Sequence, residues 1–129
     1  MTRAFRLALI AAGGFGLAGL LAAAGPPGVL ARAEGGMWEI SRSGEQASKL
    51  CVANPAVLAQ YEHRSASCTR EVVRDSASSA VISYQCSAGD FGRSEVTAIT
   101  PRSLRIETQG ISGSAPFKYV IQARRVGNC

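Results

Sequence analysis

The sequence has 129 residues, a formal net charge of +5 at pH 7 and four cysteines. Three of its arginines lie in the first 33 residues, which hold no acid, so residues 34–129 carry a formal charge of only +2. A charge this small argues against a strongly basic nucleic-acid-binding domain, and the length predicts a single domain.

The first predicted segment is a secretory signal peptide over residues 1–33. Its head, MTRAFR, is basic, and LALIAAGGFGLAGLLAAA follows without a charge. Ala31-x-Ala33 then forms a small-residue cleavage site, and we favour cleavage after Ala33. Ala22-x-Ala24 fits the same rule and is an alternative cleavage site. The apolar run could instead be an uncleaved membrane anchor, which is a less favoured interpretation. Cleavage after Ala33 leaves one periplasmic or secreted domain over residues 34–129, with no transmembrane segment.

A short strand and one helix open the predicted domain. The strand covers residues 37–40 and includes Trp38, which we interpret as a core anchor in preference to a ligand-stacking platform. Residues 42–49 are polar and predict a loop. The Asn-Pro pair at 54–55 is typical of a helix start, because asparagine caps free N–H groups and proline lacks one. The helix is expected to end near His63.

After the helix, the hydrophobic pattern changes to the alternation of strands. Further strands, separated by turn signals, are predicted at residues 68–75, 79–86, 94–100, 104–109 and 117–125. Apolar side chains that share one face of these strands are Ala80, Ile82, Tyr84, Cys86, Leu104, Ile106, Phe117, Tyr119, Ile121 and Ala123. The predicted fold is mainly β: a curved antiparallel meander sheet or an open barrel of about six strands with one short helix.

The four cysteines are Cys51, Cys68, Cys86 and Cys129. An even number in a short exported chain predicts two disulfides, whereas zinc sites usually pair ligands two to four residues apart. Three pairings are possible, and the sequence does not choose among them. We favour Cys51–Cys68, which would close a loop around the helix, and Cys86–Cys129, which would tie the last strand to an earlier one.

Four features of the chain occur in a fixed order. GGMWEI stands near the start, LCVANP places the first cysteine before the helix, SASCT and SYQC place the next two in a strand pair, and ARRVGNC ends the chain. Over residues 35–129 this order resembles a family of small bacterial periplasmic proteins, domain of unknown function 3617. The resemblance implies export, four cysteines and a β-rich fold, and it implies no established activity.

No set of residues with catalytic spacing is evident, and we assign no catalytic, cofactor-binding or metal-binding residue. The single histidine, His63, is interpreted as a surface residue at the helix end, where the helix dipole favours it. The sequence has no Cys-x-x-Cys, G-x-S-x-G or phosphate-loop motif in the predicted domain. The acids are interpreted as solvated charges, and an enzyme using two carboxylates is the less favoured alternative.

Several arginines follow the predicted strands. Arg70 and Arg74 are expected to share one strand face, and the others fall on later strands or turns: Arg93, Arg102, Arg105, Arg124 and Arg125. They predict either an arginine-rich face for anionic envelope surfaces or acidic partners, or a solvated face with glutamates interspersed.

The function predicted from these patterns is an exported, non-enzymatic binding or structural module of the cell envelope. A curved sheet can hold a small apolar ligand on its concave face or meet an envelope protein. The alternative is a small secreted inhibitor of a wall-degrading or proteolytic enzyme, which would present residues 87–92 or 110–116 as a rigid loop. No cofactor is predicted.

Overall fold

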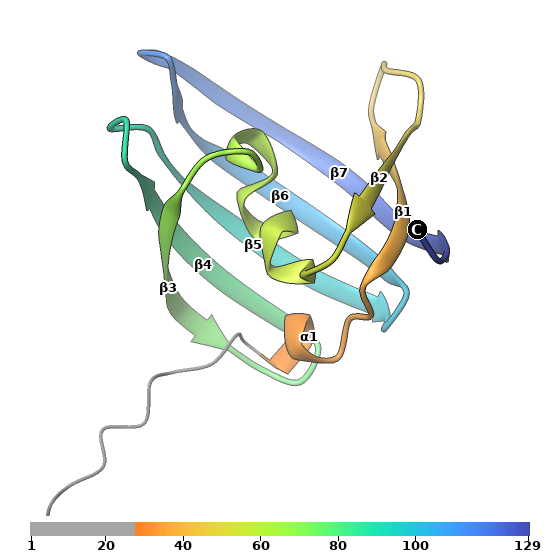
Figure 1. Cartoon of the computed structure of the whole chain (residues 1–129). Coiled ribbons are helices and arrows are strands. Elements are labelled where there is room, and N and C mark those ends of the chain that lie inside the picture. The colour runs from red at the N-terminus through yellow and green to blue at the C-terminus, as the bar shows by residue number, and fades with distance from the viewer. Residues whose placement is uncertain (1–27) are drawn as a thin grey trace, which may run out of the picture.

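The computed structural model describes residues 28–129, which form a seven-stranded antiparallel sheet in the order β2-β1-β7-β6-β5-β4-β3. Figure 1 shows the sheet curling around the 3-10 helix η1 and the short helix α1. The elements in chain order are α1 (Gly28–Ala31), β1 (Gly36–Arg42), β2 (Ser48–Val52), η1 (Pro55–His63), β3 (Cys68–Asp75), β4 (Ser79–Cys86), β5 (Phe91–Thr100), β6 (Ser103–Ser112) and β7 (Ala115–Gly127).

This architecture confirms the predicted mainly β fold and adds one strand to it. The added strand is β2, part of which was expected as a polar loop. It pairs with β1 through Trp38↔Leu50 and Glu39↔Lys49 at the edge of the sheet. Short, polar edge strands are common, because they do not offer a long unpaired edge to other chains. Such a strand has little hydrophobic alternation, so its pattern does not reveal it.

The inward faces of the predicted strands are confirmed by the cross-strand register. One row runs Ala80↔Val96↔Ile106↔Ile121 across β4, β5, β6 and β7. These four side chains are buried, as expected when alternate residues of each strand face the same side. Residues of η1 and α1 cover this row and complete one continuous core.

The helix η1 begins where the Asn-Pro pair predicts. The Asn54 side chain accepts a hydrogen bond of 3.0 Å from the backbone N–H of Ala56, and Pro55 occupies the first turn. The backbone leaves helical geometry at Gln60, whose buried amide donates to the carbonyls of His63 and Ala66. The element is therefore a 3-10 helix with a kink at Gln60, and the two hydrogen bonds of the Gln60 side chain lie at this kink.

The two disulfides join Cys51 to Cys129 and Cys68 to Cys86. The predicted existence of two disulfides is confirmed, but the predicted pairing, Cys51–Cys68 with Cys86–Cys129, is wrong. The sheet explains the difference, because Cys68 of β3 lies directly opposite Cys86 of β4. Likewise, Met37 of β1 pairs with both Cys51 and Gly127, which brings the C-terminal residue beside β2.

Trp38 lies in the core, as predicted. Its side chain is 0% exposed, and its indole N–H donates a hydrogen bond of 3.0 Å to the Glu34 carbonyl. Buried indole rings usually find such a partner, because an unpaired N–H is costly away from water. Trp38 therefore anchors β1 to the core and to the chain that precedes it.

The described chain starts inside the segment predicted to be the signal peptide. The basic head, the apolar run and the Ala22-x-Ala24 site lie outside the described residues. The Ala31-x-Ala33 site lies within them, next to Val29 and Leu30, which are buried in the core. No helix between residues 28 and 129 is long and apolar enough to cross a membrane.

Candidate functional site

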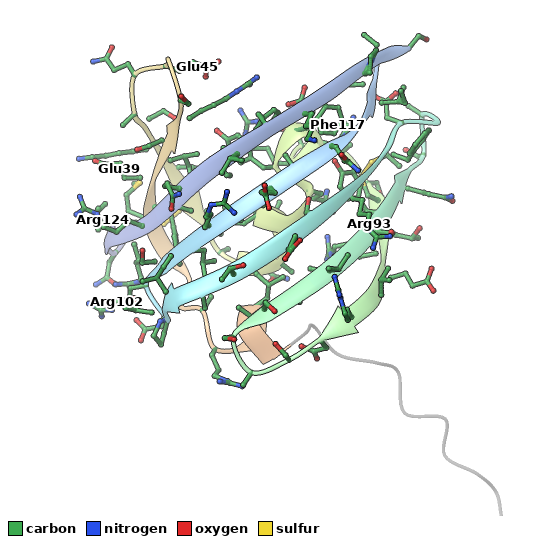
Figure 2. All side chains as sticks on the ribbon, turned by 180° about the vertical axis from the view of Figure 1, so that it is seen from behind. Glu39, Glu45, Arg93, Arg102, Phe117 and Arg124 are labelled. Carbon is green, nitrogen blue, oxygen red and sulfur yellow. A yellow bond between two sulfur atoms is a disulfide. The ribbon has the colours of Figure 1, made fainter. Side chains whose placement is uncertain are left out.

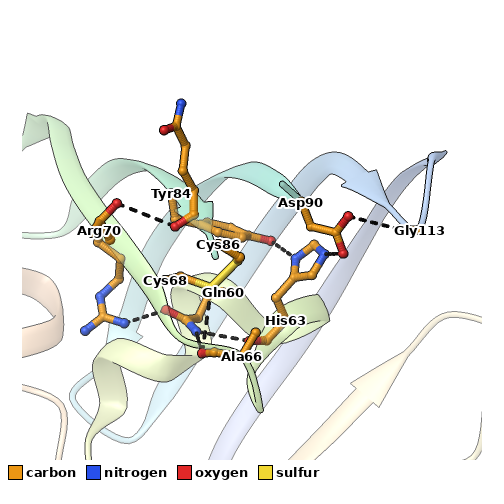
Figure 3. The surroundings of a disulfide bond; sticks show 11 residues. Gln60, His63, Ala66, Cys68, Arg70, Tyr84, Cys86, Asp90 and Gly113 are labelled. Carbon is orange, nitrogen blue, oxygen red and sulfur yellow. Dashed lines mark hydrogen bonds and ion pairs between the residues drawn. A yellow bond between two sulfur atoms is a disulfide. The ribbon is translucent and has the colours of Figure 1, made fainter. Parts of the chain in front are cut away.

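His63 lies in a buried polar cluster, and its predicted surface position is therefore wrong. The residue is 7% exposed, and its ring packs edge-on against the rings of Tyr84 and Phe117. Its Nδ1 lies 2.9 Å from the Tyr84 hydroxyl, and its Nε2 lies 3.2 Å from the Asp90 carboxylate (Figure 3). The sequence shows where η1 ends but not that this end packs against the concave face of the sheet.

The chemistry around His63 is that of a connector between elements. Its two ring nitrogens face the Tyr84 hydroxyl of β4 and the Asp90 carboxylate, so the imidazole joins η1 to two parts of the sheet. Burial, followed by the negative charge of Glu62, raises the pKa of Tyr84 to about 12, so the phenol is neutral at physiological pH. Asp90 also accepts a hydrogen bond from the Gly113 N–H, so one carboxylate links η1 to two turns of the sheet.

Two further polar contacts fasten η1 to the sheet. The Tyr119 hydroxyl donates a 2.6 Å hydrogen bond to Glu62, and burial together with this carboxylate raises the pKa of Tyr119. The Ser94 hydroxyl, buried between the layers, lies 2.6 Å from the carbonyl of Ala59. Buried polar groups need such partners, so these contacts favour one position of η1 over others.

The raised pKa of Tyr84 predicts a loss of stability in alkaline solution. Between pH 10 and about 12, the unfolded chain releases the phenolic proton while the folded chain keeps it. Ionisation of Tyr84 should therefore lower the free energy of unfolding by about 2 to 3 kcal/mol over this range. Below pH 10, Tyr84 should contribute no pH dependence to the free energy of unfolding.

Urea unfolding at pH 8 to 12 would measure this loss. Tyr84→Phe should lower stability at pH 8 but give a shallower fall above pH 10, because Tyr119 is then the one remaining tyrosine with a raised pKa in the described residues. Equal slopes in the Tyr84→Phe variant and the parent would show that Tyr84 does not cause the alkaline loss.

Arg70 and Arg74 do not share a face, contrary to the prediction. Arg70 lies opposite Tyr84 on the inner face and donates to the buried side-chain oxygen of Gln60. A register shift between Val72 and Arg74 moves Arg74 to the outer face. Such a bulge inserts an extra residue into one strand, and this reverses the alternation beyond it.

The remaining arginines are distributed over the outer face and the sheet edge. Arg93 and Arg124 project from the outer face in Figure 2, and the register places Arg105 on the same face. Arg102 and Arg125 instead contact Glu34 near the start of the described chain. Glu39, Glu95 and Glu107 are interspersed on the outer face, which fits the predicted solvated face of mixed charge.

Two rows of outward side chains cross the sheet and line an open groove. The register alone generates the rows, since neighbouring strands place one outward residue beside the next. One row is Arg74↔Val81↔Glu95↔Glu107↔Val120, and the other includes Arg93↔Gln109↔Lys118. The groove that they line has a volume of about 520 Å³, which lies within the range of small-molecule sites.

The charges along the groove are unevenly compensated. Glu95 and Glu107 lie directly opposite each other, and Arg105 forms an ion pair of 3.3 Å with Glu107. By contrast, none of Arg74, Arg93 and Lys118 has a carboxylate within ion-pair distance in the described part of the chain. The groove therefore offers three exposed cationic side chains around the apolar side chains of Val81 and Val120.

Arg74 and Arg93 are recognisable in the sequence as candidate charges, but the groove is not. Alternation predicts which residues of a strand point outward. The groove depends in addition on the bulge at Arg74 and on the register of β4 to β7, which bring distant residues into one row. Lys118 and Val120 were missed, because each is an ordinary outward residue of its own strand.

The two segments predicted as inhibitory loops are tight turns. Residues 110–116 pair within β6 and β7, except for Gly113 and Ser114, which both have positive φ, at 56° and 68°. This conformation matches the two-residue hairpin turns that follow the twist of the sheet. Asp90, within 87–92, is tied to the same turn. The structure therefore leaves no long exposed loop at either position.

The acids do not cluster with other ligating groups. Among residues 28–129, no group of three or more His, Cys, Asp or Glu side chains is placed to hold a metal ion. The opposed Glu95 and Glu107 are both exposed on the groove, and Glu107 forms its ion pair with Arg105. These two carboxylates are therefore part of the groove and do not form a separate enclosed site.

Comparison with known proteins yields one match. No curated protein and no solved structure matches the chain. A family model described as "Protein of unknown function (DUF3617)" matches residues 33–129, which include all seven strands and all four cysteines. The chain therefore belongs to this family of proteins of unknown function.

Proposed function

We propose that the chain is an exported, non-enzymatic binding module of the cell envelope, and that its outer groove binds an anionic amphiphile. Two disulfides support the exported location, because such bonds persist in oxidising compartments such as the periplasm. The ligand would combine a phosphate or carboxylate headgroup with an apolar chain.

The observation that carries this proposal is the set of exposed cations without ion-pair partners in a groove whose lining also includes two valines and two glutamates. Arg74, Arg93 and Lys118 come from β3, β5 and β7, so they frame the groove from different strands. Val81 at the floor is 4% exposed, and the half-buried Val120 lies at the other end of the same row, beyond Glu95 and Glu107. Headgroup oxygens would contact the cations, and the first carbons of the chain would pack against Val120, the more exposed of the two valines.

The outer groove is a better ligand site than the concave face. On the concave side, Leu58 and Ala59 of η1 fill the space above the sheet and belong to the core. An apolar ligand there would have to displace η1, which is held by Tyr119, Ser94 and Tyr84. The outer groove is already open, so binding requires no rearrangement of the core.

Binding to short-chain phosphatidylglycerol, kept below its micelle concentration, tests the proposal. Isothermal titration should detect binding that weakens with added salt, whereas phosphatidylcholine of the same chain length should bind more weakly. Arg93→Gln and Lys118→Gln should each lower the affinity for phosphatidylglycerol about 3- to 10-fold, because each removes a charge-assisted hydrogen bond.

Lys49→Gln is the matched control, because it removes one exposed cation from β2, outside the groove. It should leave the affinity unchanged. Equal losses in Lys49→Gln and Arg93→Gln would indicate attraction to the overall charge and would contradict a site in the groove. Equal affinity for the two lipids would contradict the requirement for an anionic headgroup.

A further inference from the structure

The helix α1 and the residues after it belong to the folded domain. Val29 is 2% exposed and Leu30 is 3% exposed, and both join the same core as Trp38. The helix contacts β4, β5 and η1 at one end of the sheet (Figure 1). There β4 and β5 carry Ala80 and Ala98 on the inner face, and these small side chains leave room that Val29 and Leu30 fill.

Polar contacts hold both ends of this segment in place. The Gly28 N–H donates to both oxygens of the Asp75 carboxylate, at 3.1 and 3.3 Å. Further along, the Glu34 carbonyl accepts from Trp38, and the Glu34 carboxylate forms ion pairs with Arg102 and Arg125. The backbone turns between these anchors through hydrogen bonds from Arg32 to Gly28 and from Ala33 to Leu30.

Cleavage after Ala33 would remove the apolar part of this segment and keep one of its anchors. The inner face at Ala80 and Ala98 would then lose the side chains that cover it. Cleavage after Ala24 avoids this cost, because it leaves residues 25–33 attached to the domain.

We infer that the leader is cleaved on the N-terminal side of α1, after Ala24, so that the mature protein begins at Gly25 and retains α1. This inference rests on the proposed export of the chain. It moves the processing site from the one favoured by the sequence to Ala22-x-Ala24, which satisfies the same small-residue rule.

Expression of the full chain in a bacterium, followed by intact-mass analysis of the periplasmic product, tests the inference. The expected N-terminus is Gly25. Ala24→Phe should block this processing, whereas Ala31→Arg should leave the N-terminus unchanged, because it alters only the site after Ala33 and the side chain is exposed. A mature N-terminus at Glu34 would overturn the inference while leaving export intact. A full-length chain in the membrane fraction would also overturn the inference, and a full-length chain in the cytoplasm would contradict export itself.

Thermal unfolding of the exported protein gives an independent readout. Leu30→Ala should lower its melting temperature by roughly 10 °C or more, as expected for truncating a buried leucine in a small domain. Ala31→Ser, on the exposed side of the same helix, should change it by no more than about 2 °C. An unchanged melting temperature in Leu30→Ala would show that the mature protein lacks α1.

Discussion

Replacing Cys51 and Cys129 with serine is expected to lower the free energy of unfolding by about 4 to 5 kcal/mol. This loss should exceed the one caused by removing the other disulfide. This bond closes a sequence separation of 78 residues, so without it the unfolded chain gains much conformational entropy. Both cysteines are exposed, so the serine hydroxyls remain in contact with water and add little further cost. The loss approaches the total stability of many small domains.

The matched comparison is the removal of the second disulfide through Cys68→Ala and Cys86→Ala. This bond spans 18 residues and joins directly paired strands, so its loss should cost about 3 kcal/mol. Urea unfolding followed by circular dichroism would measure both variants against the parent. A smaller loss for the Cys51–Cys129 pair than for the Cys68–Cys86 pair would show that loop length does not set their contributions.

Trp38→Ala is expected to lower the free energy of unfolding by about 3 to 5 kcal/mol, which is typical of a large buried aromatic side chain. The ring is 0% exposed and packs in the core with residues of η1 and α1. Trp38→Phe keeps most of the apolar contact but loses the hydrogen bond to Glu34, so its loss should be smaller, about 1 to 2 kcal/mol.

Urea unfolding followed by circular dichroism suits these variants, because Trp38 is the single tryptophan and its fluorescence is lost with it. Ile99→Ala is the control, since Ile99 is a large apolar residue of β5 that is 63% exposed. It should change stability by less than about 0.5 kcal/mol. A Trp38→Ala loss no greater than that of Ile99→Ala would contradict the role of Trp38 as a core anchor.

Local sequence signals predicted most of the sheet. Residues 68–75 and 79–86 were delimited correctly, because the turn between them is polar and apolar side chains alternate in the second strand. The Asn-Pro pair predicted the start of η1, since capping depends on neighbouring residues alone. Signals of this kind need no knowledge of what lies elsewhere in the fold.

Features that depend on distant residues were not predictable. The strand β2 was missed because it is defined by pairing with β1. The disulfide pairing was wrong because spacing does not reveal that Cys129 lies beside Cys51. The bulge before Arg74 reversed the expected face of that arginine, and no residue in VVRD marks its position.

The candidate site shows the same division between local and distant information. The charges at Arg74 and Arg93 could be identified in the sequence, but their position in one groove with Lys118 depends on the register of the sheet. His63 was assigned to the surface because its helix-end position was visible and its neighbours were not. Tyr84 and Asp90, which surround it, come from a strand and a turn further along the chain.

If the outer groove binds an anionic amphiphile, an NMR titration should locate the ligand on the outer face of the sheet. Short-chain phosphatidylglycerol should shift the amide signals of Val81, Arg93, Gln109, Lys118 and Val120, which line the groove. The signals of Leu58 and Ala59 in η1 should remain unchanged. Shifts confined to η1 and the concave face, or no shifts at all, would contradict the proposed site.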